Sequence, residues 1–298
     1  MFNINIEVST GKVGALERKE SIMKNLMKGE KLKIGGKKID LSPYIKESKD
    51  GCVIGRLDDV TSKEDVVIDE RKNPPKVTTS LQNMLTVARL YTKVNGDATT
   101  PTLVFTVKKK NYEMQFPTSS PLGELSLIST LSCVYRSYKK EWVDLNKSTV
   151  KDRFTNVMYV PKVAILLNDN GKVIKPYNVN VLIVALASPK NIKLKEDELL
   201  NNEEKVGLLV ADIMNGCIKM GCKNVILNPF SYKFLYKNAN LTTEAFVKIT
   251  ESAKFQEQFN TLTFTFECED DFIKFEATKK ALNNFRVKAA LKHDEDDE

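Results

Sequence analysis

The residues of this chain that could do chemistry are concentrated between positions 102 and 138. Residues 103–107 are apolar and β-prone, which predicts a strand, and residues 125–138 carry apolar side chains at helical spacing. A strand that leads into a helix through a loop is a common place to bind a phosphorylated ligand, because the first helical amides face it. Asn111 and Glu124 lie in this connection, and Glu124 could act as a general acid or contact a ribose.

The connecting loop contains no glycine before Gly123. Phosphate-binding loops use glycine because its backbone can approach a phosphate group closely. An anion would therefore meet side chains here. We favour a structural role for Glu124, as an acidic residue stabilised by the positive end of the helix dipole. Asn111 is equally compatible with an ordinary loop.

This pattern resembles the bacterial-type poly(ADP-ribose) glycohydrolases of the macrodomain superfamily. Their motif at this place reads Asn-Pro-Gly-Gly-Gly-Phe, and after a spacer Gln-Glu-Glu opens a helix. On this chain Asn111 matches the asparagine and Phe116 matches the phenylalanine, while Glu113, Met114 and Gln115 replace the glycines.

In the same register, the Gln-Glu-Glu motif falls on Gly123, Glu124 and Leu125. The resemblance then implies that leucine replaces the glutamate that the family uses as its catalytic acid. A shift of one residue would place Glu124 at the catalytic position, but it would not restore the glycines. Asn111, Phe116 and Glu124 are the remaining candidates for ligand contacts.

A second glycine-rich phosphate loop of the family follows a strand that corresponds to residues 224–227. Asn228, Ser231, Lys233 and Tyr236 stand at its four glycine positions in this chain. The resemblance therefore implies that both phosphate loops are lost and that the domain is not catalytic.

The resemblance extends over residues 15–285. It implies an α/β fold with a macrodomain-like mixed, largely parallel central sheet flanked by helices, and with a helical N-terminal extension. We divide the chain into an N-terminal arm (1–14), this domain (15–285) and an acidic C-terminal tail (286–298). We expect a helix over 281–292, followed by a disordered acidic end over 293–298. Further matching residues are Arg18, 39–45, Tyr159, Pro161, Val163, Gly171, Pro176, Tyr177, Ala185 and Ala187.

Local patterns predict several elements. Residues 15–28, 205–220, 241–253 and 271–285 have helical spacing, and glycines 35 and 36 suggest a small hairpin. Asn170-Gly171 predicts a tight hairpin between two strands in 156–189. Residues 58–80 are charged and contain two prolines, so we expect a loop, with Ser80 capping a helix over 81–94.

The chain is basic. Its formal net charge is +7, and because residues 294–298 are all acidic, the remainder carries +12. Lysines and aromatic residues of the two altered loops could form an interface, and both loops would lie at the same end of the sheet. Exposed aromatic residues are typical anchors for a protein partner, and the same groups could stack on nucleic-acid bases. The candidates are Lys108, Lys109, Lys110 and Tyr112 in the first loop, and Tyr232, Lys233, Phe234, Tyr236 and Lys237 in the second.

Cysteine and histidine usage restricts the chemistry. The five cysteines form no CxxC pair, and His293 is the only histidine, so we expect reduced thiols, no metal site and no cofactor. No apolar run is long enough to cross a bilayer. We expect an intracellular protein, cytoplasmic or nuclear, and the lysine- and asparagine-rich composition also suits a viral protein or a component of a virion or other large assembly.

Together these observations favour a non-catalytic macrodomain-like interaction or structural module within a larger assembly, with a protein partner or self-assembly. Two alternatives remain open. One is an ADP-ribose or poly(ADP-ribose) binder, or a glycohydrolase with an altered pocket. The other is a nucleic-acid-binding module that uses the basic aromatic loops.

Overall fold

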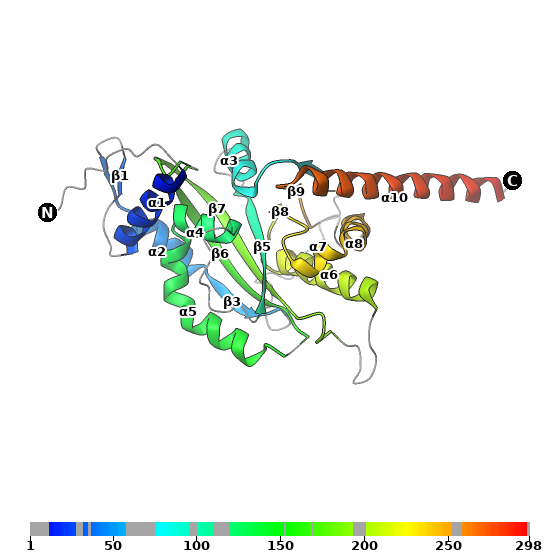
Figure 1. Ribbon diagram of the computed structural model, residues 1–298, viewed down its shortest axis with the longest axis horizontal. Helices are drawn as coiled ribbons and strands as arrows, with labels where there is room; N and C mark the ends of the chain where they lie inside the picture. Colours follow the sequence, from blue (N-terminus) through cyan, green and yellow to red (C-terminus); the bar gives the residue numbers. More distant parts are fainter. Residues whose placement is uncertain are drawn as a thin grey trace.

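The computed structural model describes residues 12–27, 32–34, 37–57, 75–95, 100–109, 120–151, 153–168, 170–192, 201–251, 255 and 258–296. They form an α/β structure built on one central sheet, with a small hairpin near the N-terminus (Figure 1). Among these residues, no helix combines the length and the apolar character that a membrane span requires.

The central sheet has seven strands in the order β3-β6-β7-β5-β8-β9-β4. From β7 to β4 all neighbouring strands are parallel, whereas β6 is antiparallel to both β7 and β3. The expected mixed, largely parallel sheet is therefore confirmed. Its strands are β3 (Val53–Arg56), β4 (Lys76–Ser80), β5 (Thr102–Lys108), β6 (Asn156–Leu167), β7 (Val173–Leu186), β8 (Asn224–Leu227) and β9 (Thr261–Thr265).

Helices cover both faces of this sheet (Figure 1). Buried side chains of the N-terminal set pack on one face, and those of the C-terminal set pack on the other. The first set is α1 (Lys12–Met27), α2 (Ser42–Asp50), α3 (Met84–Asn95), α4 (Pro121–Ile128) and α5 (Leu131–Ser148). The second set is α6 (Asn202–Lys219), α7 (Lys233–Lys237), α8 (Ala239–Glu251) and α10 (Glu269–Asp296).

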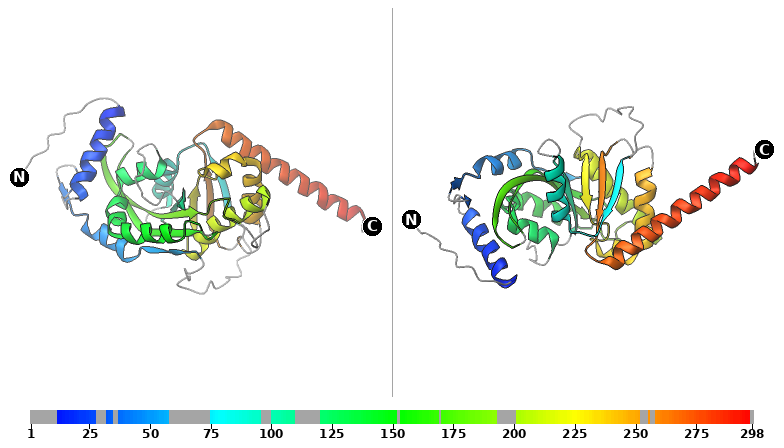
Figure 2. Two further views of the ribbon diagram at one scale, coloured as in Figure 1. Left: turned by 60° about the horizontal axis from the view of Figure 1, so that its bottom comes forward. Right: turned by 90° about the horizontal axis from the view of Figure 1, so that it is seen from above.

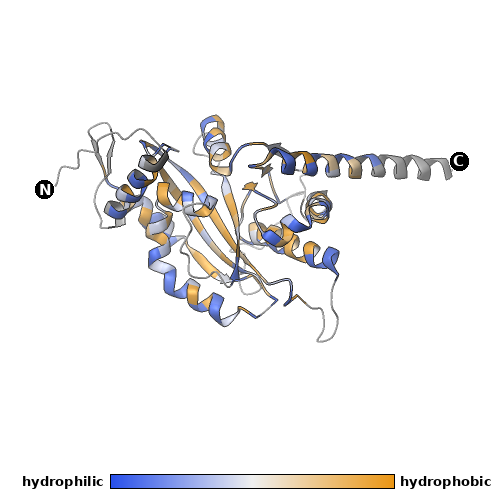
Figure 3. Ribbon diagram, in the orientation of Figure 1, coloured by the Kyte–Doolittle hydropathy of each residue, from blue (hydrophilic) through white to orange (hydrophobic). Residues whose placement is uncertain are grey.

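The strands divide the interior into two cores because successive side chains point to opposite faces. On β5, Val104 belongs to the core under α6 and α8, whereas Leu103 and Phe105 belong to the core under α3, α4 and α5. Neighbouring β7 alternates in the same way, with Leu182 on one side and Ile183 on the other. Figure 3 shows long hydrophobic stretches along the central strands, as expected where both faces are buried.

We expected a loop over 58–80, and this prediction is wrong for its last five residues. Residues 58–74 lie outside the described part. Lys76–Ser80 forms the edge strand β4, parallel to β9. Ser80 does not cap a helix, because it is the last residue of β4 and α3 begins only at Met84. Its carbonyl accepts a hydrogen bond from the Phe266 amide at 2.9 Å. Instead the side chain of Asn83 accepts from the Thr86 amide at 2.8 Å, just before α3 begins. The strand depends on a partner almost 200 residues away, which local patterns do not reveal.

The single helix expected over 125–138 is divided into α4 and α5. The break at Ser129 and Thr130 allows this backbone to pair with β6. Thr130 donates its amide to the Ala164 carbonyl at 3.0 Å, and its hydroxyl accepts from the Ala164 amide at 3.0 Å. Tertiary pairing thus overrides a pattern that is locally helical.

Several other expectations are confirmed. Helix α1 and the hairpin of β1 (Leu32–Ile34) and β2 (Lys37–Ile39) occur as predicted, and Gly171 turns the β6–β7 hairpin with φ of 69°. Residues 1–11 of the proposed arm lie outside the described residues.

The C-terminal segment differs from the expectation. Helix α10 continues to Asp296, so residues 293–296 of the end expected to be disordered are helical. Alanine, leucine and lysine, which are frequent over 281–292, have high helix propensity.

Helix α6 ends in a glycine-dependent cap. Gly221 has φ of 65° and donates its amide to the Ile218 carbonyl, and the Cys222 amide donates to the Cys217 carbonyl, both at 2.9 Å. These two bonds form a Schellman motif, in which a left-handed residue ends the helix.

We expect Gly221→Ala to lower the free energy of unfolding by about 1 kcal/mol, because a Cβ atom disfavours the left-handed conformation. No neighbouring atom lies within 4 Å of the added Cβ, so the backbone alone should account for the loss. Gly207→Ala, inside α6, is the matched control. It also meets nothing within 4 Å, and it should stabilise by about 0.5–1 kcal/mol. Urea unfolding of both variants measures this, and equal effects would contradict it.

Candidate functional site

Glu124 lies in the first turn of α4, and local sequence explains why the helix starts there. Pro121 stands at a position where a helix needs no amide hydrogen, and the Ser120 side chain accepts from the Gly123 amide at 3.0 Å. This cap fixes where Glu124 emerges from the helix.

The carboxylate of Glu124 forms an ion pair with Lys19 of α1. Lys19 Nζ lies 3.3 Å from Glu124 Oε1, and the two side chains are 8% and 38% exposed. Lys19 is therefore a nearly buried cation whose charge is compensated by a half-exposed carboxylate. The pair joins the N-terminal helix to the segment that the sequence singled out for chemistry.

Leu125, the next residue, is fully buried in the core with Leu122 and Ile128. A carboxylate at this position would point into apolar surroundings, where an unpaired charge is strongly disfavoured. The resemblance places the family's catalytic glutamate at Leu125, and this position belongs to the hydrophobic core.

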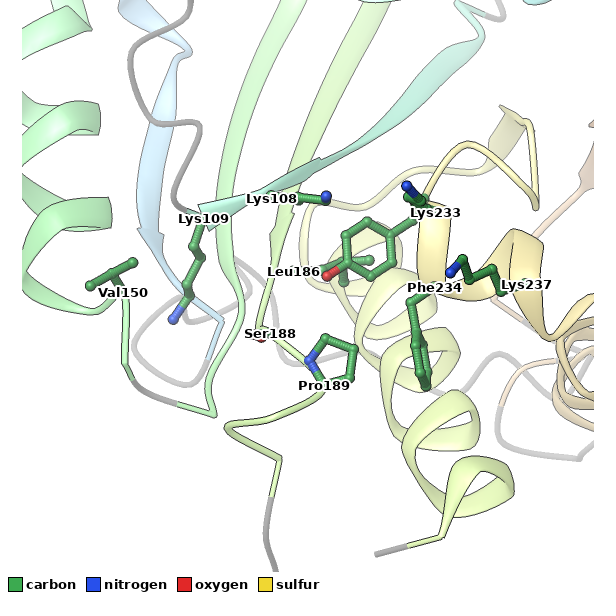
Figure 4. A pocket seen from close by; sticks show the side chains of 10 residues that line it. Lys108, Lys109, Val150, Leu186, Ser188, Pro189, Lys233, Phe234 and Lys237 are labelled. Carbon is green, nitrogen blue, oxygen red and sulfur yellow. The ribbon is translucent and has the colours of Figure 1, made fainter.

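A cavity of about 320 Å³ lies at the carboxyl ends of β5 and β7, beside α7 (Figure 4). The carboxyl edge of parallel strands is the usual place for a ligand in open α/β sheets. Four lysines line the cavity, together with apolar and small residues, and none of the described lining residues is acidic. Its lining is Lys108, Lys109, Val150, Leu186, Ser188, Pro189, Tyr232, Lys233, Phe234 and Lys237.

The four lysines are not equivalent. Lys109 is 2% exposed, and its ammonium group donates to the Thr149 carbonyl at 2.8 Å. Figure 4 shows it directed toward Val150, away from the other three. Lys109 therefore holds the end of α5, whereas Lys108, Lys233 and Lys237 are half-buried or exposed.

A buried polar network surrounds the contact of Lys109. The Asn156 side-chain amide donates to Asn146 Oδ1 at 3.1 Å and to Thr149 Oγ1 at 2.7 Å. These bonds tie the end of α5 to the first residue of β6. The wall of the cavity near Val150 is consequently fixed by hydrogen bonds within the protein.

The aromatic candidates are divided between the core and the surface. Tyr232 is 4% exposed and donates its hydroxyl to the Ala187 carbonyl at 3.2 Å, and burial raises its pKa. Phe234 packs against the core, and Tyr236 is 50% exposed and meets Phe230 edge-on at 6.4 Å. Tyr232 and Phe234 therefore serve packing, and Tyr236 is the exposed member of the three.

The structure brings together Lys108, Lys109, Tyr232, Lys233, Phe234 and Lys237, which line one cavity. Glu124 does not line it, and α4 and α7 lie on opposite sides of β5 in Figure 1. The other candidates, Lys110, Asn111, Tyr112 and Phe116, lie outside the described residues.

The sequence reasoning missed Lys19. Its signal was present, because Lys19 is three residues after Leu16 and four before Met23, on the apolar face of the helix.

The buried thiols do not provide an alternative chemistry. All five cysteines are free, and Cys217 and Cys222 are buried. Burial raises the pKa of Cys222 to about 12, which leaves little thiolate at neutral pH. In the described part of the chain, no three His, Cys, Asp or Glu residues cluster to hold a metal ion.

Sheet order, flanking helices and the edge cavity define a macrodomain-like α/β fold, and comparisons specify its type. No family model and no curated protein matches the sequence. Among solved structures, poly(ADP-ribose) glycohydrolase from Thermomonospora curvata matches with a TM-score of 0.68 at 14% identity, over 89% of this chain and 99% of that one. The enzyme from Deinococcus radiodurans in complex with ADP-ribose matches with a TM-score of 0.62 at 14% identity, over 84% and 99%. The protein therefore has a poly(ADP-ribose) glycohydrolase-like macrodomain fold.

We expect Glu124→Ala to lower the free energy of unfolding by about 1–2 kcal/mol, because it leaves the Lys19 ammonium group buried without its carboxylate. Lys19→Met together with Glu124→Ala should recover most of this loss, since no unpaired buried charge remains. A double-mutant cycle in urea measures the coupling. The control is Glu47→Ala in the exposed Lys162–Glu47 pair, which should change stability much less. Additive effects of the two substitutions would contradict the expectation.

Proposed function

We propose that this protein is a non-catalytic macrodomain-like module, which serves as an interaction or structural component of a larger assembly. The observation that carries the proposal is the ion pair of Glu124 with the buried Lys19. A general acid must lie within hydrogen-bond reach of its substrate. A carboxylate that compensates a buried cation of another helix has a structural task instead.

The residue after Glu124 supports the same conclusion. Glycoside hydrolysis ordinarily needs at least one carboxyl group placed at the scissile bond. Leu125 is a core residue, so neither register of the family motif supplies a carboxylate that is free for this task.

The altered loop after β8 also supports it. Phe230, Tyr232 and Leu235 of this segment are buried in the core. Large side chains thus occupy a stretch where the resemblance implies a glycine-rich phosphate loop. Backbone amides flanked by such side chains are less accessible to a diphosphate than those of a glycine loop.

We expect no release of ADP-ribose when the full chain is incubated with poly(ADP-ribose), because no free carboxylate is available at the start of α4. Glu124→Ala should give the same background, which is the control for contaminating activity. Turnover by the wild type that disappears in Glu124→Ala would overturn the non-catalytic proposal. The assay measures ADP-ribose released over time at substrate saturation.

A second candidate function is binding of ADP-ribose or its polymer without hydrolysis. The lysine-lined cavity favours it, because lysine ammonium groups bind phosphate oxygens as point charges. The solved neighbour from Deinococcus radiodurans is in complex with ADP-ribose, which makes this ligand the first to test.

If this second function is correct, calorimetry should detect micromolar binding of ADP-ribose to the wild type. Replacing Lys108, Lys233 and Lys237 by alanine should then weaken binding roughly tenfold or more through loss of charge-assisted contacts. Replacing Lys93, Lys139 and Lys140, which are exposed on α3 and α5, is the matched control and should have little effect. Absence of heat from the wild type would exclude this function and leave the first.

A further inference from the structure

The strongest charge contrast in the chain lies between the cavity and the end of α10. Lys108, Lys233 and Lys237 line the cavity, and among the described residues no carboxylate forms an ion pair with them. Residues 294–298 are all acidic. The described residues of the cavity and the last five residues of the chain therefore carry opposite charge.

The position of the acidic residues adds a second argument. Asp294, Glu295 and Asp296 lie in the last turn of α10. The carboxyl end of a helix carries partial negative charge, so carboxylates there are disfavoured unless cations lie nearby. A positively charged partner would stabilise this helix end.

The acidic end of α10 cannot reach the cavity of its own chain while the helix is intact. The beginning of α10 packs on the domain, where Phe275 is fully buried. The helix has 28 residues, which corresponds to a length of about 42 Å. Figures 1 and 2 show it projecting away from α7 and β5, which line the cavity.

We propose that the acidic end of α10 docks into the lysine cavity of a second copy of this chain. The cavity volume of about 320 Å³ is at the lower end of small-ligand pockets, so it suits a few carboxylate side chains better than a folded surface. Leu186, Pro189 and Phe234 form apolar walls beside the lysines, which lowers the local dielectric and favours ion pairing there. The inference deepens the proposed function by naming the partner of the module.

Such a contact joins two different surfaces, the helix end of one copy and the cavity of the next. A heterologous contact of this kind does not close on itself as a two-fold dimer does. The protein should therefore form chains or rings whose size increases with concentration, in keeping with a component of a larger assembly.

The test uses two full-length variants. In the cavity variant, Lys108, Lys233 and Lys237 are each replaced by glutamate. In the tail variant, Asp294, Asp296 and Asp297 become asparagine, and Glu295 and Glu298 become glutamine. Sedimentation velocity is measured over a range of concentrations at about 50 mM and about 500 mM salt, since ion pairs are screened at the higher value.

We expect the wild type to associate at low salt, with association roughly tenfold weaker at high salt. Each variant alone should stay monomeric. An equimolar mixture should form dimers only, because the intact tail of the cavity variant fits the intact cavity of the tail variant. The control variant with Lys93, Lys139 and Lys140 replaced by glutamate carries the same charge change outside the cavity and should associate like the wild type.

A monomeric wild type at low salt would overturn the inference, as would a mixture that fails to form dimers. Association of the tail variant like that of the wild type would also overturn it. The tail substitutions lie at a helix end, so this variant tests the inference even if the cavity variant does not fold. The hydrolysis assay is independent, so failure of self-association leaves the non-catalytic proposal intact.

Discussion

Burial of the central strands on both faces is the constraint on which the rest of the structure depends. The middle strands β5, β7 and β8 alternate their side chains between two cores, so each core needs its own cover of helices. This requirement recruits α1 to α5 on one face and α6, α7, α8 and α10 on the other. The same arrangement places the ends of β5 and β7 and the segment after β8 at one edge of the sheet. Lys108 of β5 and Lys233 and Lys237 of α7 line one cavity there.

At that edge, lysine and aromatic side chains from two segments lie close together. Lys109 is directed to the end of α5, and Tyr232 bonds to the chain beyond β7, so both stabilise the edge itself. Lys108, Lys233 and Lys237 remain directed toward solvent and the cavity. The described lining of the cavity thus carries positive charge on side chains that the sheet edge itself does not use.

The N-terminal helix also provides a lysine with a structural contact. Lys19 of α1 reaches across to Glu124, so a helix outside the sheet compensates the acidic residue that starts α4. Desolvation offsets much of the attraction within a partly buried ion pair, so the pair adds little net stability. Removing one partner is nevertheless costly, because the other charge is then left buried alone. Here the pair joins α1 to α4.

The sequence by itself determined much of the order of elements and the absence of glycine from the loop after β8. These features depend on local periodicity, turn residues and residue identity. The tertiary structure alone decided that Lys76–Ser80 forms a strand, that the helix over 125–138 is broken at Ser129, and that Lys19 meets Glu124. Each of these depends on a partner distant in the chain: β9, β6 and α4 respectively. Pairing of backbone groups and compensation of buried charge are properties of neighbours in space, which local patterns cannot specify.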